Sequence, residues 1–257
     1  MGRLGDVHGC DRVEALAALP PLPADAQLRG EVNALQARLA QAAAARLVAR
    51  LAPARAIADA AVAGARPLGY LPLLGRALLE QGRIRNAMVD NRGAEASLRE
   101  ALAVAARTRD DGLAADAWEE LYYALEQMTR TAEVDALGLA YDLAVARSGN
   151  EPRRRARALV QRARVRWLLG DAIGALALAA QSLAVIEASG GRDSLEAADT
   201  LLVIADQLNG QGRRQAALPH LERALAIVTT TLGPQHPRVA QVLQVMGPTL
   251  EHVGRPA

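Results

Sequence analysis

The sequence of 257 residues contains no lysine and no phenylalanine, and it has only two tryptophans, four tyrosines and one cysteine. Its 30 basic residues are therefore all arginines, and with 28 acidic residues they give a formal net charge of +2. The missing lysine excludes catalysis by a protein-kinase mechanism, which requires one. The single cysteine, Cys10, excludes an internal disulfide and is predicted to be a free structural thiol. His8 lies close to it, but two possible ligands do not make a metal site, so we expect no metal and no cofactor.

Export and membrane signals are also missing. The first ten residues, MGRLGDVHGC, lack the apolar core of a signal peptide. The stretch from Trp167 to Ile186 has the length of a membrane span, but Gly170-Asp171 and then Gln181 interrupt it. We therefore expect a soluble cytoplasmic protein. No nucleophile with a base and no converging pair of carboxylates stands out, so no catalytic residue is expected.

What the sequence does contain is a regular spacing of glycines. Gly170, Gly212 and Gly254 stand 42 residues apart in the phrases LLGD, GQGR and HVGR. A small residue precedes each glycine by seven positions, and an alanine follows the first two by five. These small residues are Ala163, Ala205 and Gly247, and then Ala175 and Ala217. A repeat of this length with small residues in register is typical of stacked helical hairpins. The sequence therefore predicts an all-α fold.

The helical pattern extends through most of the chain. We expect an irregular segment over 1–23, followed over 24–257 by a solenoid of about five hairpins and an unpaired terminal helix beginning near Pro237. In the second hairpin, LGRALLEQGR (74–83) reads as a copy of the glycine phrase, with Gly82 in the position of Gly170. On that interpretation Ala94 and Ala101 lie further from the glycine than the small residues that follow Gly170. An insertion of about seven residues between the two helices is therefore implied.

These residues carry a family resemblance. At LGRALLEQGR, and at the small residues around Gly170 and Gly212, the chain resembles tetratricopeptide repeat (TPR) proteins. Trp118 and Leu121 fit the residues that open a first helix in that family. The phrase LGPQHPRVA (232–240) resembles the segment between repeats of the kinesin-light-chain kind, whose period is longer than usual. The resemblance implies a right-handed solenoid of antiparallel helix hairpins, well matched over 66–257 and loosely over 24–65.

A broader resemblance concerns the segment GARPLGYLPLLGRALLEQG (64–82). It is similar to the carboxy-terminal TPR region of bacterial, myxobacterial-type serine/threonine kinases, which implies a signalling role. The kinase motifs themselves are missing, because the sequence has no Gly-rich nucleotide loop, no HRD and no DFG. On this hypothesis the chain is a detached regulatory or substrate-recruiting region and not an enzyme.

The TPR resemblance also implies a binding surface. In that family the first helices of the hairpins line a concave face that receives an extended or helical peptide. Transferred position by position, the lining residues or their neighbours are Arg76, Glu119, Tyr123, Glu126, Arg157, Arg164, Asp206 and Asn209. The mixture of signs favours a polar peptide. The resemblance thus implies a protein or peptide partner, and neither the partner's identity nor the oligomeric state follows from it.

The helix from Arg153 to Arg166 carries seven arginines and allows other interpretations. It could bind an acidic partner or nucleic acid, or it could be a solvated face supported by pairing within the helix. Scarcity of aromatic side chains leaves little for base stacking, so we consider nucleic acid an improbable partner.

Overall fold

The computed structural model describes residues 22–254, and these residues form helices without a strand. The all-α prediction is therefore confirmed. The twelve helices are α2 (Ala26–Leu47), α3 (Leu51–Leu68), α4 (Leu71–Ala87), α5 (Asn91–Thr108), α6 (Asp111–Gln127), α7 (Thr131–Ala136), α8 (Gly138–Arg147), α9 (Pro152–Leu168), α10 (Ala172–Ala188), α11 (Leu195–Gly210), α12 (Arg214–Leu232) and α13 (Pro237–His252). Nearly all of the segment expected to be irregular, with His8 and Cys10, lies outside the described residues.

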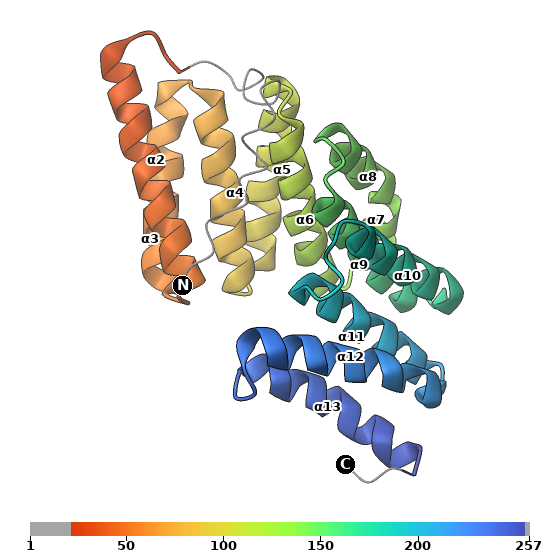
Figure 1. Cartoon of the computed structure of the whole chain (residues 1–257). Coiled ribbons are helices and arrows are strands. Elements are labelled where there is room, and N and C mark those ends of the chain that lie inside the picture. The colour runs from red at the N-terminus through yellow and green to blue at the C-terminus, as the bar shows by residue number, and fades with distance from the viewer. Residues whose placement is uncertain (1–21, 255–257) are drawn as a thin grey trace. The chain divides into compact units, whose positions relative to one another are not determined.

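The chain consists of two compact units, Met1–Ala117 and Trp118–Ala257, and the boundary falls inside α6. In the first unit α2 packs along α3 and α4 packs along α5 (Figure 1). In the second unit α9 pairs with α10 and α11 with α12, and α13 packs on α12. No helix within residues 22–254 is long and apolar enough to cross a membrane.

The turn between the two helices of each hairpin has the same backbone conformation along the chain. One residue adopts a left-handed conformation there, with φ between 58° and 84°. These residues are Ala49, Val89, Thr129, Gly170, Gly212 and Gly254. The last three are the glycines of the sequence repeat, and the first three are spaced 40 residues apart. A left-handed turn that ends the first helix is thus shared by both units; the second unit has threonine at Thr129 and glycine at the three later turns.

The second hairpin corrects one sequence interpretation. Gly82 is not a turn residue, because it lies inside α4 and the turn falls seven residues later at Val89. Gly82 thus has the register of Ala163, which precedes Gly170 by seven. The residues Ala94 and Ala101 follow Val89 by the same intervals at which small residues follow Gly170. The predicted insertion of about seven residues is therefore wrong, because the repeat continues without it.

Close helix packing explains why a glycine stands at position 82. A Cβ atom there would lie 2.6 Å from Cγ and Cδ2 of Leu98, whose side chain is fully buried on α5. In the later hairpins alanine is sufficient at this register, and Ala163 and Ala205 are completely buried. Small residues at these crossings let the paired helices approach closely and leave no void.

The third hairpin has no small residue on its first helix where the paired helices cross. Tyr122 stands at the crossing position, and its ring packs on Tyr141 with 5.0 Å between the ring centroids. Gly138 provides room for it, because a Cβ at that position would lie 3.2 Å from the Tyr122 hydroxyl. The second helix of this hairpin is divided at Leu137 into α7 and α8. Burial raises the pKa of the Tyr122 hydroxyl, which therefore stays protonated at neutral pH.

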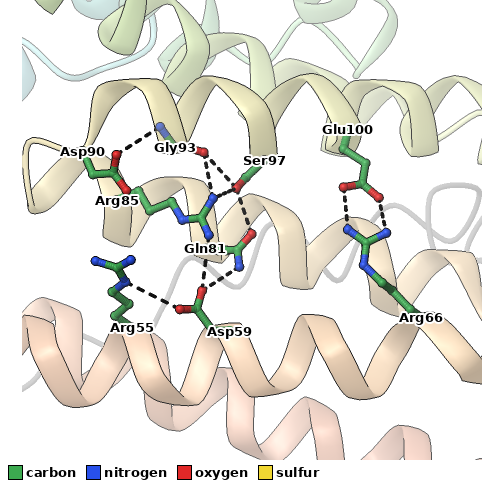
Figure 2. A network of polar contacts seen from close by, with 9 residues as sticks. All are labelled: Arg55, Asp59, Arg66, Gln81, Arg85, Asp90, Gly93, Ser97 and Glu100. Atoms are coloured by element: carbon green, nitrogen blue, oxygen red, sulfur yellow. Dashed lines mark hydrogen bonds and ion pairs between the residues drawn. The ribbon is translucent and has the colours of Figure 1, made fainter.

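A polar network joins α3 to the second hairpin (Figure 2). Nη1 of Arg85 in α4 donates to the carbonyl oxygen of Gly93 and to Oγ of Ser97, both at 2.9 Å. Ser97 Oγ donates to Oε1 of Gln81 at 2.8 Å, and Gln81 Nε2 donates to Oδ1 of Asp59 in α3 at 2.6 Å. Since Ser97 and Gln81 are buried, these bonds satisfy polar groups that could not reach water.

Replacing Val89 by glycine is expected to raise the free energy of unfolding by about 1 kcal/mol. A β-branched residue in the left-handed region costs about 1–2 kcal/mol, and the greater chain entropy of glycine offsets part of the gain. Val89 is 75% exposed, so little packing is lost. Urea unfolding measures the change, and the reverse substitution Gly170→Val should lower stability by a similar amount. Equal stability of both variants and the wild type would contradict the assignment of these turns.

Candidate functional site

The second unit contains an open cleft of about 1070 Å³. Its walls come mainly from α9 and α11, which are the first helices of consecutive hairpins, with contributions from α6 and α13. On α9 the lining residues Arg157, Arg164 and Leu168 recur at intervals of seven and four, which places them on one helix face. The cleft therefore follows from the hairpin stacking, since each first helix presents the same face to it.

The structure brings together most of the predicted groove residues. Five of the eight line this cleft: Glu119, Glu126, Arg157, Arg164 and Asp206. Asn209 instead donates from Nδ2 to Oγ1 of Thr249 at 2.9 Å, within the packing of α11 and α13. Tyr123 is 38% exposed but does not line the cleft, and Arg76 is an exposed residue of the first unit. A binding role for any of these eight residues stays a prediction.

Three ion pairs across the hairpins neutralise most of the charge in the cleft. Nε of Arg153 lies 2.6 Å from Oε1 of Glu196. Nη1 of Arg157 lies 3.5 Å from Oε1 of Glu119. Arg238 on α13 pairs with Asp199 on α11. Because these side chains are partly exposed, each pair contributes only about 0–1 kcal/mol to stability. Because the three ion pairs neutralise six side chains, few charges in the cleft remain available to a binding partner.

Glu126, Arg164 and Asp206 are the charged lining residues outside these pairs. Burial raises the pKa of the Glu126 carboxyl above its usual value, and the nearby Arg164 guanidinium opposes that rise. Glu126 and Arg164 thus interact electrostatically, and the cleft as a whole is lined by five carboxylates and four arginines. Asp206 is exposed and forms no ion pair with any of the described residues, so its carboxylate is the unbalanced charge of the cleft.

Replacing Arg164 by methionine should raise the pKa of Glu126 further, because the opposing positive charge is removed. A carboxyl whose folded pKa is raised stabilises the fold at low pH, and this contribution is lost as pH rises through the folded pKa. As the pH rises through the folded pKa of Glu126, the free energy of unfolding should therefore fall more for the Arg164→Met variant than for the wild type. A ¹³C NMR titration of the Glu126 carboxyl measures the pKa directly. Arg155→Met, on an exposed part of the same helix, is the matched control and should leave it unchanged.

Two glutamines at the cleft carry amide atoms without hydrogen-bond partners. Gln207 on α11 is only 2% exposed, and neither Oε1 nor Nε2 has a partner. Oε1 of Gln161 on α9 is also buried without a partner. Such atoms are costly and uncommon in native structures, and a binding role is one explanation for them. Sequence reasoning missed both residues, because a glutamine on a helix is usually exposed.

Trp167 on α9 also lines the cleft. Its ring edge packs against the backbone of α11 at Gly210. A Cβ atom at Gly210 would lie 2.3 Å from Cζ2 of Trp167. Gly210 follows Asp206 by one helical turn, so the indole ring lies on the same face of α11 as the unbalanced carboxylate.

The arginine-rich helix α9 is largely neutralised. Five of its seven arginines form ion pairs, with partners on other helices or within one turn: Arg153, Arg154, Arg157, Arg162 and Arg166. This favours the interpretation of a solvated, internally paired face over a surface for phosphate backbones. Within the described ranges no group of three or more potential metal-ligating side chains comes together.

Comparisons with known proteins agree with this architecture. Residues 196–257 match the model of the tetratricopeptide repeat family. No curated protein matches the chain. A putative kinesin light chain from Podosopora anserina, with nearly identical TPR-like repeats, is similar in structure with a TM-score of 0.64 and 20% identity. That match covers 78% of this chain and 97% of the other.

A second solved structure, BtubC (BKLC) from P. vanneervenii, gives a TM-score of 0.63 at 20% identity and covers 90% of this chain and 85% of that one. The predicted resemblance to TPR proteins of the kinesin-light-chain kind is thus confirmed. These comparisons do not bear on the broader likeness to kinase-associated regions, which stays a prediction. The chain is a helical repeat protein with the tetratricopeptide-repeat fold, and the segment containing α11, α12 and α13 matches the model of that family.

Proposed function

We propose that the chain is a non-catalytic interaction scaffold that binds an extended or helical peptide of a partner protein in the cleft along α9 and α11. The observation that carries this proposal is the cleft itself, because three consecutive first helices and α13 contribute the same kind of face to one surface. A repeat scaffold of this kind presents its partner with several parallel helices, and a peptide lying across them can contact each in turn.

The composition of the cleft supports a peptide over a small apolar ligand. Its lining combines apolar side chains such as Val160, Leu202 and Val245 with nine charged residues. Protein-binding surfaces commonly combine an apolar centre with a polar rim. Small-molecule sites are more enclosed and carry fewer charges. The unpartnered amides of Gln161 and Gln207 add hydrogen-bonding capacity that a peptide main chain can use.

Selection from a displayed library of random peptides of about twelve residues tests the proposal. The wild-type chain is expected to enrich a defined family of peptides. Asp206→Arg, which reverses a charge inside the cleft, should lose that family or select a different one. Asp193→Arg makes the same change at an exposed position outside the cleft and should select the same peptides as the wild type. Enrichment no greater than that of an unrelated helical protein would overturn the proposal.

A further inference from the structure

The charge balance of the cleft points to the sign of its ligand. Of its nine charged lining residues, five are acidic and four are arginines, and six of the nine are joined in three ion pairs. Asp206 is left as a single exposed carboxylate. The abundance of arginine in α9 would by itself suggest an acidic ligand, but those side chains are already matched. The unmet charge is negative, so the complementary group on a ligand is a cation.

An aromatic ring lines the same cleft as this carboxylate. Trp167 packs its ring edge on Gly210, one turn beyond Asp206 on α11. No cation from the described residues stacks on the indole ring, and the ring faces the cleft. Tryptophan is the aromatic side chain that attracts a cation most strongly, and guanidinium groups are the most frequent partners. A carboxylate and an indole ring that line the same cleft are therefore a suitable environment for an arginine side chain.

The third component is the amide of Gln207, the residue that follows Asp206. It is buried and lines the same cleft, and both of its polar atoms lack partners. A side-chain amide offers one acceptor and two donors, which matches the N–H and C=O groups of a peptide bond. Glutamine has three rotatable side-chain torsions, so a change of rotamer can bring these atoms to the floor of the cleft.

We infer that Asp206, Trp167 and Gln207 form a subsite for one cationic residue of the partner peptide, with arginine preferred. Asp206 pairs with the guanidinium, the indole ring of Trp167 supports its flat face, and the Gln207 amide binds the peptide main chain beside it. The inference rests on the proposed peptide-binding function and specifies the chemistry of one position in that peptide.

The peptides selected by the wild-type chain provide the first test. One position should be fixed as arginine, with lysine as the main substitute. A fluorescein-labelled peptide from this family is then compared with the same peptide carrying citrulline, which keeps the shape of arginine but has no charge. Fluorescence anisotropy should show binding weakened about three- to tenfold by citrulline. In the Asp206→Asn and Trp167→Leu variants, the difference in affinity between the arginine and citrulline peptides should be smaller than in the wild type.

Gln207→Met separates a binding role from a structural role. Removing an unpartnered buried amide should leave the thermal midpoint unchanged or higher, while peptide binding weakens about fivefold. A structural role would give the opposite result, with lower stability and binding unchanged in the folded fraction. Peptide enrichment without a fixed basic position, or equal binding of arginine and citrulline peptides, would overturn the subsite and leave the proposed function standing. Failure to enrich any peptide would overturn both.

Discussion

Gly82→Ala is expected to lower the free energy of unfolding by about 1–3 kcal/mol, although alanine is the better helix former. The added methyl group would lie 2.6 Å from two carbon atoms of Leu98. The Leu98 side chain is completely buried in the packing of α4 against α5, so it cannot move aside without displacing its own neighbours. Urea unfolding, with the midpoint and slope fitted together, measures the loss.

The control for this variant is Gly30→Ala in α2. Gly30 is also a helical glycine, but nothing lies within 4 Å of the position that its Cβ would take. That substitution should raise stability by about 0.5–1 kcal/mol, because only the helix propensity changes. If both variants were equally stable, the account of Gly82 as a packing residue would be wrong. Shortening Leu98 to alanine should cost less in the Gly82→Ala background than in the wild type, since the two sites are in contact.

The second large effect is expected for Arg85→Met, with a loss of about 1–3 kcal/mol. Arg85 Nη1 bonds to two groups of α5, and Nη2 lies 3.5 Å from Asp59 of α3. Methionine keeps the apolar stem but leaves the carbonyl oxygen of Gly93 without this donor and weakens the hold on Ser97. Partial exposure of Asp59 reduces the expected loss below that of a fully buried pair.

Arg55→Met is the matched control in this network. Arg55 also contacts Asp59 at 3.5 Å, but both side chains are at least 40% exposed and the pair lies within one helix (Figure 2). Its removal should cost about 0.5 kcal/mol or less. Thermal unfolding of the two variants should therefore differ clearly. Similar midpoints would mean that the network in Figure 2 contributes little to the stability of the packing between α3 and the second hairpin.

The sequence predicts the fold class well. It also predicts the hairpins in the second half of the chain, because glycine marks the left-handed turns there. In the first half the same turns use Ala49, Val89 and Thr129, which rarely adopt positive φ and therefore give no signal. Gly82, one of the two glycines in α4, was consequently aligned with Gly170 although it lies inside the helix. Helical periodicity identifies the helices, but it does not distinguish a glycine needed for close packing from one needed for a turn.

The candidate site is only partly predictable for a different reason. The repeat register predicts one helix face for Arg157, Arg164 and Asp206, and all three line the cleft, while their binding role stays a prediction. The register does not reveal which charges are paired, because partners such as Glu119 and Arg157 come from different hairpins. The buried amide of Gln207 could not be predicted either, since its burial depends on neighbouring helices and not on its own sequence position.

We propose that the cleft along α9 and α11 is the binding surface, and the two tryptophans of the chain allow a direct test. Trp167 lines the cleft and Trp118 does not. With both residues replaced by 5-fluorotryptophan and the resonances assigned through Trp118→Phe, a selected peptide is titrated and followed by ¹⁹F NMR. We predict that the Trp167 resonance shifts to saturation while the Trp118 resonance stays in place. A peptide that binds and shifts Trp118 alone, or neither resonance, would contradict the account.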